Sequence, residues 1–143
     1  MKTLKFLTLI TLVIGLLSFD KNDNYLKEDV IIFAGKYSRE FGTQDTVRTV
    51  IYTIKQNIIN YNLQGGSVNV NYDTEKKYYS KKVNRWIGYR KDKDTYYVIF
   101  FKNIKDDEIT LYKKKIASVE EGKSEPIPAD DNEENHGWNT YQK

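Results

Sequence analysis

A chain of 143 residues can form one domain with a hydrophobic core and little else. It contains no cysteine, which excludes a disulfide framework, a thiolate metal site and a lipid-modified cysteine. The charge is divided unevenly, because residues 19–116 carry 19 basic and 13 acidic side chains whereas residues 117–143 carry 2 and 7. A basic body can attract nucleic acid, anionic lipid or an acidic partner, but the lysines at 81–82 and 113–115 are more simply explained as solvated ends of strands.

The N-terminus has the layout of a secretory signal peptide over residues 1–18. Lys2 and Lys5 precede a twelve-residue apolar run, and Ser18 offers a small residue for cleavage before Phe19. A helix that spans a bilayer needs about 20 apolar residues, so the run is too short for a membrane anchor. We therefore expect a cleaved signal, export to a bacterial periplasm or the medium, no stable membrane span afterwards, and a polar lead-in at residues 19–29.

The first half of the remaining chain is predicted to form strands, because β-branched and aromatic residues alternate with polar ones between turn-forming residues. Gly42 and Asp45 mark the first turn. The pair Gly65 and Gly66 is the strongest hairpin signal in the chain, since tight turns demand a positive φ. These strands are expected at residues 30–40, 46–55, 58–63 and 68–72.

The second half is predicted to form a three-stranded meander. Its middle strand is apolar on both faces and should therefore lie centrally, covered on each side by other structure. Residues 73–77 are predicted to be a charged loop, whereas residues 78–83 fit either a short strand or a continuation into the meander. The strands of the meander are expected at residues 84–90, 95–102 and 108–113.

Together these patterns predict an all-β domain over residues 30–116. It should be an antiparallel meander of about seven to eight strands that forms a small barrel or sandwich. Residues 117–143 are rich in acidic side chains and poor in apolar ones, so we expect an acidic, flexible tail that is dispensable for folding. Trp138 and Tyr141 are isolated aromatic residues in this tail, and we expect them to stay exposed or to make a weak contact.

The chain offers little for catalysis or metal binding. Its single histidine, His136, lies in the acidic tail without a positioned partner, so neither a catalytic triad nor a zinc site can be assembled on the domain. The acidic clusters at 92–94, 106–108 and 130–134 lack the spacing of a calcium-binding loop and are interpreted as solvated turns. We predict no enzymatic activity, no catalytic residue, no cofactor and no metal.

The aromatic content is more informative. Twelve tyrosines, six phenylalanines and two tryptophans exceed what one modest core requires, so some rings could line a cavity or a binding surface. The alternative is that the rings form cross-strand pairs that stiffen the sheet, and both interpretations stay open. In each predicted strand, one face is formed by a consistent alternation of side chains, and we take this face to point inward. The aromatic residues on it are the candidate ligand-binding residues Tyr37, Tyr52, Tyr61, Trp86, Tyr97 and Phe101.

Gly35, Lys36 and Tyr37, at the head of a series of hairpins, resemble the opening strand of the small lipocalin-like (calycin) β-barrels of bacterial envelopes. Those families often open on a Gly-x-Trp strand, and Tyr37 stands where the tryptophan would be. The pattern also lacks a C-terminal helix after the last strand. The resemblance implies a barrel that binds a small apolar molecule in its interior.

Two other functions stay open. An exported domain with a basic, aromatic face could be an inhibitor or immunity-type protein that binds another protein. The interleaved lysines and tyrosines at residues 76–82 also fit a nucleic-acid-binding barrel, although export argues against nucleic acid as a partner. A cavity within the barrel would favour a small ligand, whereas a filled barrel with an exposed aromatic patch would favour a protein partner.

Overall fold

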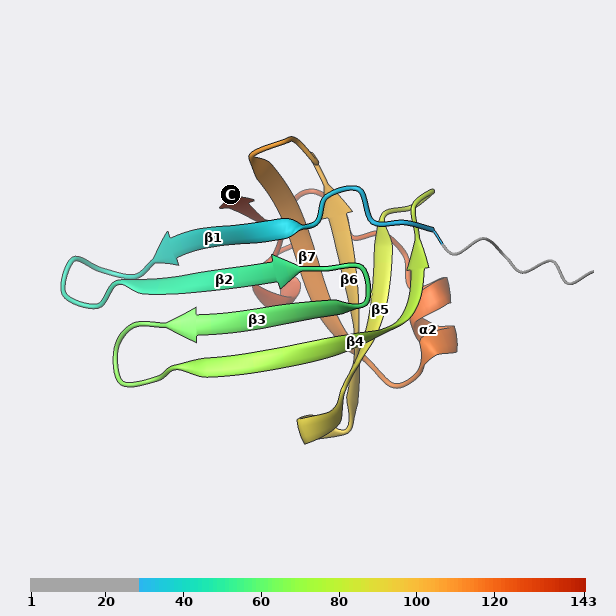
Figure 1. Cartoon of the computed structure of the whole chain (residues 1–143), viewed down its shortest axis with the longest axis horizontal. Coiled ribbons are helices and arrows are strands. Elements are labelled where there is room, and N and C mark those ends of the chain that lie inside the picture. Colours follow the sequence, from blue (N-terminus) through green and yellow to red (C-terminus); the bar gives the residue numbers. More distant parts are fainter. Residues whose placement is uncertain (1–28) are drawn as a thin grey trace, which may run out of the picture.

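Eight antiparallel β-strands form a closed barrel in the computed structural model, which describes residues 29–143 (Figure 1). The strands are β1 (Gly35–Phe41), β2 (Arg48–Ile54), β3 (Ile58–Gln64), β4 (Val70–Ser80), β5 (Arg85–Arg90), β6 (Thr95–Lys102), β7 (Glu108–Ile116) and β8 (Asn139–Gln142). Each strand pairs with the next along the chain, and β8 returns to pair with β1. The predicted all-β meander is confirmed, and it closes as a barrel. The predicted signal peptide at 1–18 and the lead-in up to residue 28 lie outside the described residues.

Two groups of strands cross each other in the barrel. β1 to β4 lie side by side along the long axis, and β5 to β7 run across behind them in Figure 1. β4, with 11 residues, passes from one group to the other, and its register with β5 shifts between Lys76 and Tyr78. A bulge of this kind bends a strand locally, which allows a sheet to curl and close.

The prediction of a charged loop at residues 73–77 is wrong, because this segment is the middle of β4. Asp73 is exposed and accepts a hydrogen bond of 2.6 Å from the Asn60 side chain on β3. Thr74, next to it, is buried, and Glu75 is half-exposed again. Asp73, Glu75 and Lys77 therefore lie on the solvent face of the strand, and the small inward residue Thr74 gave no apolar signal.

The interior of the barrel is filled by side chains that alternate along the strands, and Trp86, the largest of them, is 0% exposed. Gly88 lies two residues further along β5, where a Cβ would come within 1.8 Å of the Thr74 Cγ2. Glycine at this position thus lets β4 and β5 pack closely. The inner core consists of Ile31, Phe33, Tyr37, Val50, Tyr52, Ile54, Ile59, Tyr79, Trp86, Ile99, Phe101, Ile109, Leu111 and Tyr141.

The segment before β1 plugs one end of the barrel. β1 begins at Gly35 and not at residue 30 as predicted, yet Ile31 and Phe33 are buried in the inner core. The Phe33 ring lies 4.8 Å from that of Phe101, and the Phe33 carbonyl accepts a hydrogen bond of 3.0 Å from the Tyr37 hydroxyl. The apolar residues that indicated a strand here are buried as a plug instead.

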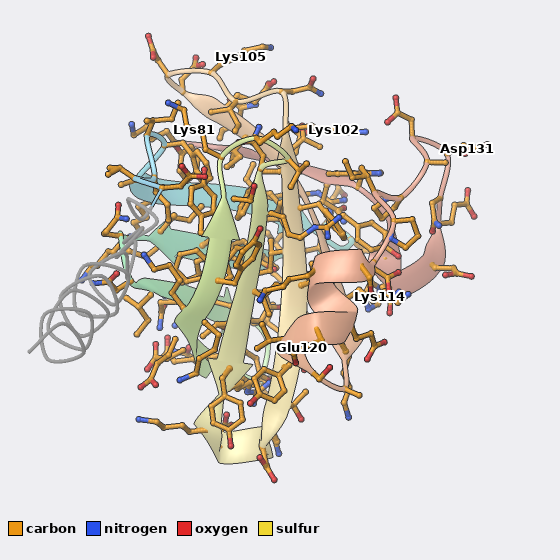
Figure 2. The ribbon with its side chains drawn as sticks, turned by 90° about the vertical axis from the view of Figure 1, so that its right-hand side faces the viewer. Lys81, Lys102, Lys105, Lys114, Glu120 and Asp131 are labelled. Atoms are coloured by element: carbon orange, nitrogen blue, oxygen red, sulfur yellow. The ribbon has the colours of Figure 1, made fainter. Side chains whose placement is uncertain are left out.

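A second hydrophobic cluster lies on the outside of β5, β6 and β7. The helix α2 (Val119–Ser124) lies over these strands, and Lys114, beside it in Figure 2, is ion-paired with Glu125. The prediction that residues 95–102 form a central strand with both faces covered is therefore confirmed. No helix within residues 29–143 has the length and apolar character needed to cross a membrane. The outer cluster consists of Ile87, Val98, Phe100, Tyr112 and Ile116, with Tyr78, Tyr96, Val119 and Trp138 packed against it.

Two buried residues fasten α2 to the barrel. The Arg85 guanidinium donates hydrogen bonds to the carbonyl oxygens of Gly122 at 3.0 Å and Glu125 at 2.6 Å, which satisfies free carbonyls near the end of the helix. A Cβ on Gly122 would lie 2.6 Å from the Ile116 Cδ1 and 2.8 Å from the Ile87 Cδ1. A Cβ here would displace the ends of two isoleucine side chains, so glycine favours the close approach of the helix to the sheet.

The segment after Ile116 differs from the flexible tail expected at residues 117–143. It forms α2 and β8, and Tyr141 is buried in the inner core with its ring 5.1 Å from that of Tyr52. Trp138 packs on the outer cluster, 5.6 Å from the Tyr112 ring. β8 pairs its backbone with the existing edges of β7 and β1, so it needs only one inward aromatic residue to be stable. For this reason its polar composition gave no strand signal.

Candidate ligand pocket

A pocket of about 420 Å³ enters the barrel at the end opposite the N-terminal plug. One wall comes from β1, β2 and β3, and the other from β7, β8 and the short helix η2 (Glu134–His136). The lining combines aromatic and aliphatic side chains with a few polar and basic groups. The lining residues are Arg39, Phe41, Val50, Tyr52, Tyr61, Leu111, Lys113, Asn135, His136, Gly137, Asn139 and Tyr141.

The other end of the interior is filled. Trp86 and Phe101 are almost completely buried there, together with the plug residue Phe33. Between the filled end and the pocket lies a void of about 10 Å³, bordered by Tyr72 and Tyr97 among others. A water molecule needs about this volume, so the void has no room for a larger ligand. A small molecule bound inside the barrel would therefore have to occupy the open end.

Four tyrosines form a continuous row across β1 to β4 beside the pocket. In the strand register Tyr37 pairs with Tyr52, Tyr52 with Tyr61, and Tyr61 with Tyr72. The Tyr61 ring lies 5.2 Å from both of its neighbours. Burial raises the pKa of Tyr52 well above its usual value and raises the pKa of Tyr141, on the opposite wall, to about 12. These hydroxyls therefore stay neutral at physiological pH and can donate or accept hydrogen bonds.

Lys113 lies at the inner end of the pocket, where it borders both the pocket and the small void. It is the second residue after Leu111 and shares its inward direction on β7. Its Nζ lies 4.3 Å from the centre of the Tyr61 ring and 5.5 Å from that of Tyr97. Burial, reinforced by the nearby Arg90 guanidinium, lowers the Lys113 pKa to about 8. The side chain is thus charged at neutral pH and loses its proton in mildly alkaline solution.

Two arginines near the pocket have polar partners. Arg90 stacks over the Tyr72 ring at 3.5 Å and donates two hydrogen bonds of 2.6 Å to the Asp92 carboxylate, which raises the Arg90 pKa. Arg39, exposed at the rim, donates a hydrogen bond to the side-chain oxygen of Asn139. None of the lining residues is acidic, so the pocket has a positive electrostatic character.

The rim of the pocket at η2 has unusual backbone geometry. Asn135, His136 and Gly137 have consecutive positive φ values of 52°, 74° and 65°, a conformation that residues with a Cβ adopt at a steric disadvantage. The Asn135 side chain donates a hydrogen bond of 3.0 Å to the Tyr112 hydroxyl, which ties this rim to the outer face of β7. The rim is therefore held in place by a specific contact despite its unfavourable torsion angles.

The six residues predicted to bind a ligand all lie on the inner face of the barrel, but at different depths. Tyr52 and Tyr61 line the pocket, and Tyr97 borders the small void. The other three are core residues, namely Tyr37, Trp86 and Phe101. A molecule in the pocket would contact Tyr52 and Tyr61 and would not touch Trp86. Their role in binding stays a prediction.

Several lining residues were missed by the sequence analysis. Lys113 was assigned to a solvated strand end, although its spacing of two from Leu111 and four from Ile109 places it on the inward face. Tyr141 was missed because its strand carries no second apolar residue. The rim at residues 135–137 has no periodic signal at all, since it is irregular backbone.

Within the described part of the chain, no group of three or more histidine or acidic side chains is arranged to hold a metal ion. Comparison of the chain with family models, with curated proteins and with solved structures found no match. What the pocket can bind is therefore inferred from its own shape, chemistry and charge.

Proposed function

We propose that this protein is a non-enzymatic binding protein that holds a small, largely apolar molecule in the open end of its barrel. The observation that carries the proposal is the pocket of about 420 Å³ with walls formed by Val50, Tyr52, Tyr61 and Leu111. Ligand pockets generally have volumes of about 300–1,000 Å³, apolar and aromatic walls, and a small number of polar groups that fix orientation. The pocket has each of these properties.

The topology supports the same function by analogy. Up-and-down barrels of eight antiparallel strands include the lipocalins, whose interior is wide enough for one small ligand. This barrel has the same number and order of strands, with Tyr37 buried on β1. We include in the proposal that the protein is lipocalin-like and that residues 1–18 direct its export to the periplasm or the medium.

The alternative function, binding a protein partner through a basic, aromatic face, has less support. The aromatic residues on the outside of β5 to β7 are packed beneath α2 and Trp138. Among the large hydrophobic side chains that are exposed within residues 29–143, only Phe41 is aromatic. A hot spot for a protein partner usually requires a cluster of such side chains.

Fluorescence of N-phenylnaphthylamine, an uncharged probe that brightens in apolar surroundings, tests the proposal. We expect saturable binding at one site on the unaltered protein. Val50→Trp fills the pocket and should abolish binding, whereas Val47→Trp adds the same side chain at an exposed position outside the pocket and should not. Both variants must first show cooperative unfolding. Absent binding to the unaltered protein, or equal binding to both variants, would reject the pocket as the site.

A further inference from the structure

Lys113 carries a positive charge into the pocket, and none of residues 29–143 neutralises it. An ammonium group has three hydrogen-bond donors, yet the neighbours of this one are ring faces, with the centres of Tyr61, Tyr97 and Tyr52 at 4.3, 5.5 and 6.0 Å. In the described part of the chain it forms no ion pair and no side-chain hydrogen bond. The charged group that acts on it most is Arg90, a second cation.

Comparable cations of the barrel are compensated. Arg90 is held by the Asp92 carboxylate, and Lys114, the next residue along β7, is ion-paired with Glu125 on the outer face. A charge removed from water is unfavourable unless it is paired and hydrogen-bonded. The tyrosine rings give Lys113 a favourable electrostatic contact but no acceptor for its N–H groups. Lys113 is half-buried, so the acceptors for its N–H groups come from water in the empty pocket or from a bound molecule that replaces this water.

We infer that the pocket binds a monoanionic amphiphile whose carboxylate or sulfonate group accepts hydrogen bonds from the Lys113 Nζ. This inference rests on the proposed function and names its class of ligand. One negative charge matches the one ammonium group inside the pocket, since Arg90 already has Asp92 as its partner and Arg39 lies exposed at the rim. The Lys113 pKa of about 8 supports the inference, because the side chain is protonated at neutral pH.

The placement of charge also sets the orientation of the ligand. Lys113 borders the small inner void, so the acidic group lies at the inner end of the pocket. The apolar body then extends between Val50 and Leu111 toward Phe41 at the rim. Arg39, exposed at the rim, is the competing position for an acidic group, and an experiment must separate the two.

A displacement experiment tests the inference. Bound N-phenylnaphthylamine is displaced by decanoate, decanol or decylamine, three compounds that differ only in the head group. At pH 7 decanoate should bind roughly tenfold or more tightly than decanol, because the alcohol lacks the charge-assisted hydrogen bond, and decylamine should bind most weakly. Lys113→Met retains the length of the side chain without its charge and should abolish the preference for decanoate while still binding the probe. Lys115→Met removes the same charge from an exposed position on β7 and should keep the preference.

Each alternative outcome has a distinct meaning. A preference for decanoate that survives in Lys113→Met would overturn the inference, and so would its loss in Arg39→Gln alone, which would place the acidic group at the rim. Equal displacement by all three compounds would overturn the inference and leave the proposed function intact, whereas absent probe binding would overturn both. If Lys113→Met fails to fold, Lys113→Gln gives the same comparison with a neutral polar side chain.

Discussion

At both ends of the barrel every second residue of a strand points inward, but these side chains fill the interior at one end and line a pocket at the other. At the plugged end, Phe33, Trp86 and Phe101 belong to one packed apolar cluster. At the open end, Tyr61 and Lys113 border a void of about 420 Å³. Buried apolar surface stabilises a fold by about 25 cal/mol per Å², whereas a void and an uncompensated charge reduce its stability. The stability of this barrel is therefore concentrated at one end, and the other end contains the pocket.

Removal of β8 should have the largest effect, because this strand completes the wall shared by both ends. A chain that lacks residues 138–143 loses Tyr141 from the inner core and leaves β1 and β7 with unpaired edges. Loss of one buried aromatic side chain costs about 3–5 kcal/mol, and the lost strand pairing adds to this, so we expect at least about 5 kcal/mol. Urea denaturation followed by circular dichroism measures this loss in the free energy of unfolding. Nearly unchanged stability would restore the expectation of a dispensable tail.

Phe101→Ala tests the plugged end. The side chain is 4% exposed and contacts the Phe33 ring, so we expect a loss of about 3–5 kcal/mol in the free energy of unfolding. Phe41→Ala removes the same side chain from the rim, where it is 39% exposed, and should cost less than about 1 kcal/mol. Equal losses in the two variants would contradict the concentration of stability at the plugged end.

Lys113→Met should stabilise the empty protein by roughly 1–3 kcal/mol at pH 7, because it removes a charge from a poorly solvated site. The Lys113 pKa is about 8 in the folded state, against an ordinary value of 10.5. Between these two pH values the unfolded chain binds more protons, so the stability of the unaltered protein rises with pH relative to the variant. The advantage of Lys113→Met should be complete below pH 8 and lost near pH 10.5.

Paired urea denaturation curves of the two proteins across this pH range check the prediction. The buried tyrosines titrate in both proteins, so their effects largely cancel in the difference. An advantage that is absent at pH 7, or that grows as the pH rises, would show that the Lys113 ammonium is well accommodated in the empty pocket.

His136→Gly should have the smallest effect, within about 1 kcal/mol, because two contributions oppose each other. Glycine relieves the steric strain of a φ of 74°, but it also makes the unfolded chain more flexible. Glu134→Gly, in the same short helix but without a positive φ, has only the unfavourable contribution and should be the less stable of the two. Thermal unfolding compares them, and the opposite order would mean that the rim is not strained at His136.

The sequence predicted the fold best where one physical effect dominates. Residues 95–102 were placed centrally because apolar residues on both faces must be covered on both sides, and the structure confirms this. Trp86 was placed on the inner face because of the alternation of side chains along its strand, and it is completely buried there. Lys113 was misjudged because its chemistry indicates solvent while its position along β7 indicates the interior. At that residue the periodicity, and not the side-chain type, gave the right direction.

The remaining differences concern parts of the chain without a repeating pattern. β8 depends on edges that β1 and β7 present only after they have formed, so no local property of residues 139–142 could reveal it. The rim at residues 135–137 is set by backbone torsion angles and by the hydrogen bond between Asn135 and Tyr112, which are tertiary features. All six predicted residues lie on the inner face, but only Tyr52 and Tyr61 are among the twelve residues that line the pocket.

The position of β8 along the chain has a consequence for how the protein is made. Ser38 on β1 and Gln142 on β8 are 104 residues apart, whereas every other pair of neighbouring strands is adjacent in sequence. During synthesis, β1 to β7 can assemble only into an open sheet whose two edges stay available to other chains until residues 139–142 have been added. Closing so long a loop is entropically costly and tends to be slow. We expect closure of the barrel to be a late step of folding, and the pocket, whose wall includes Asn139 and Tyr141, to be complete only after that step.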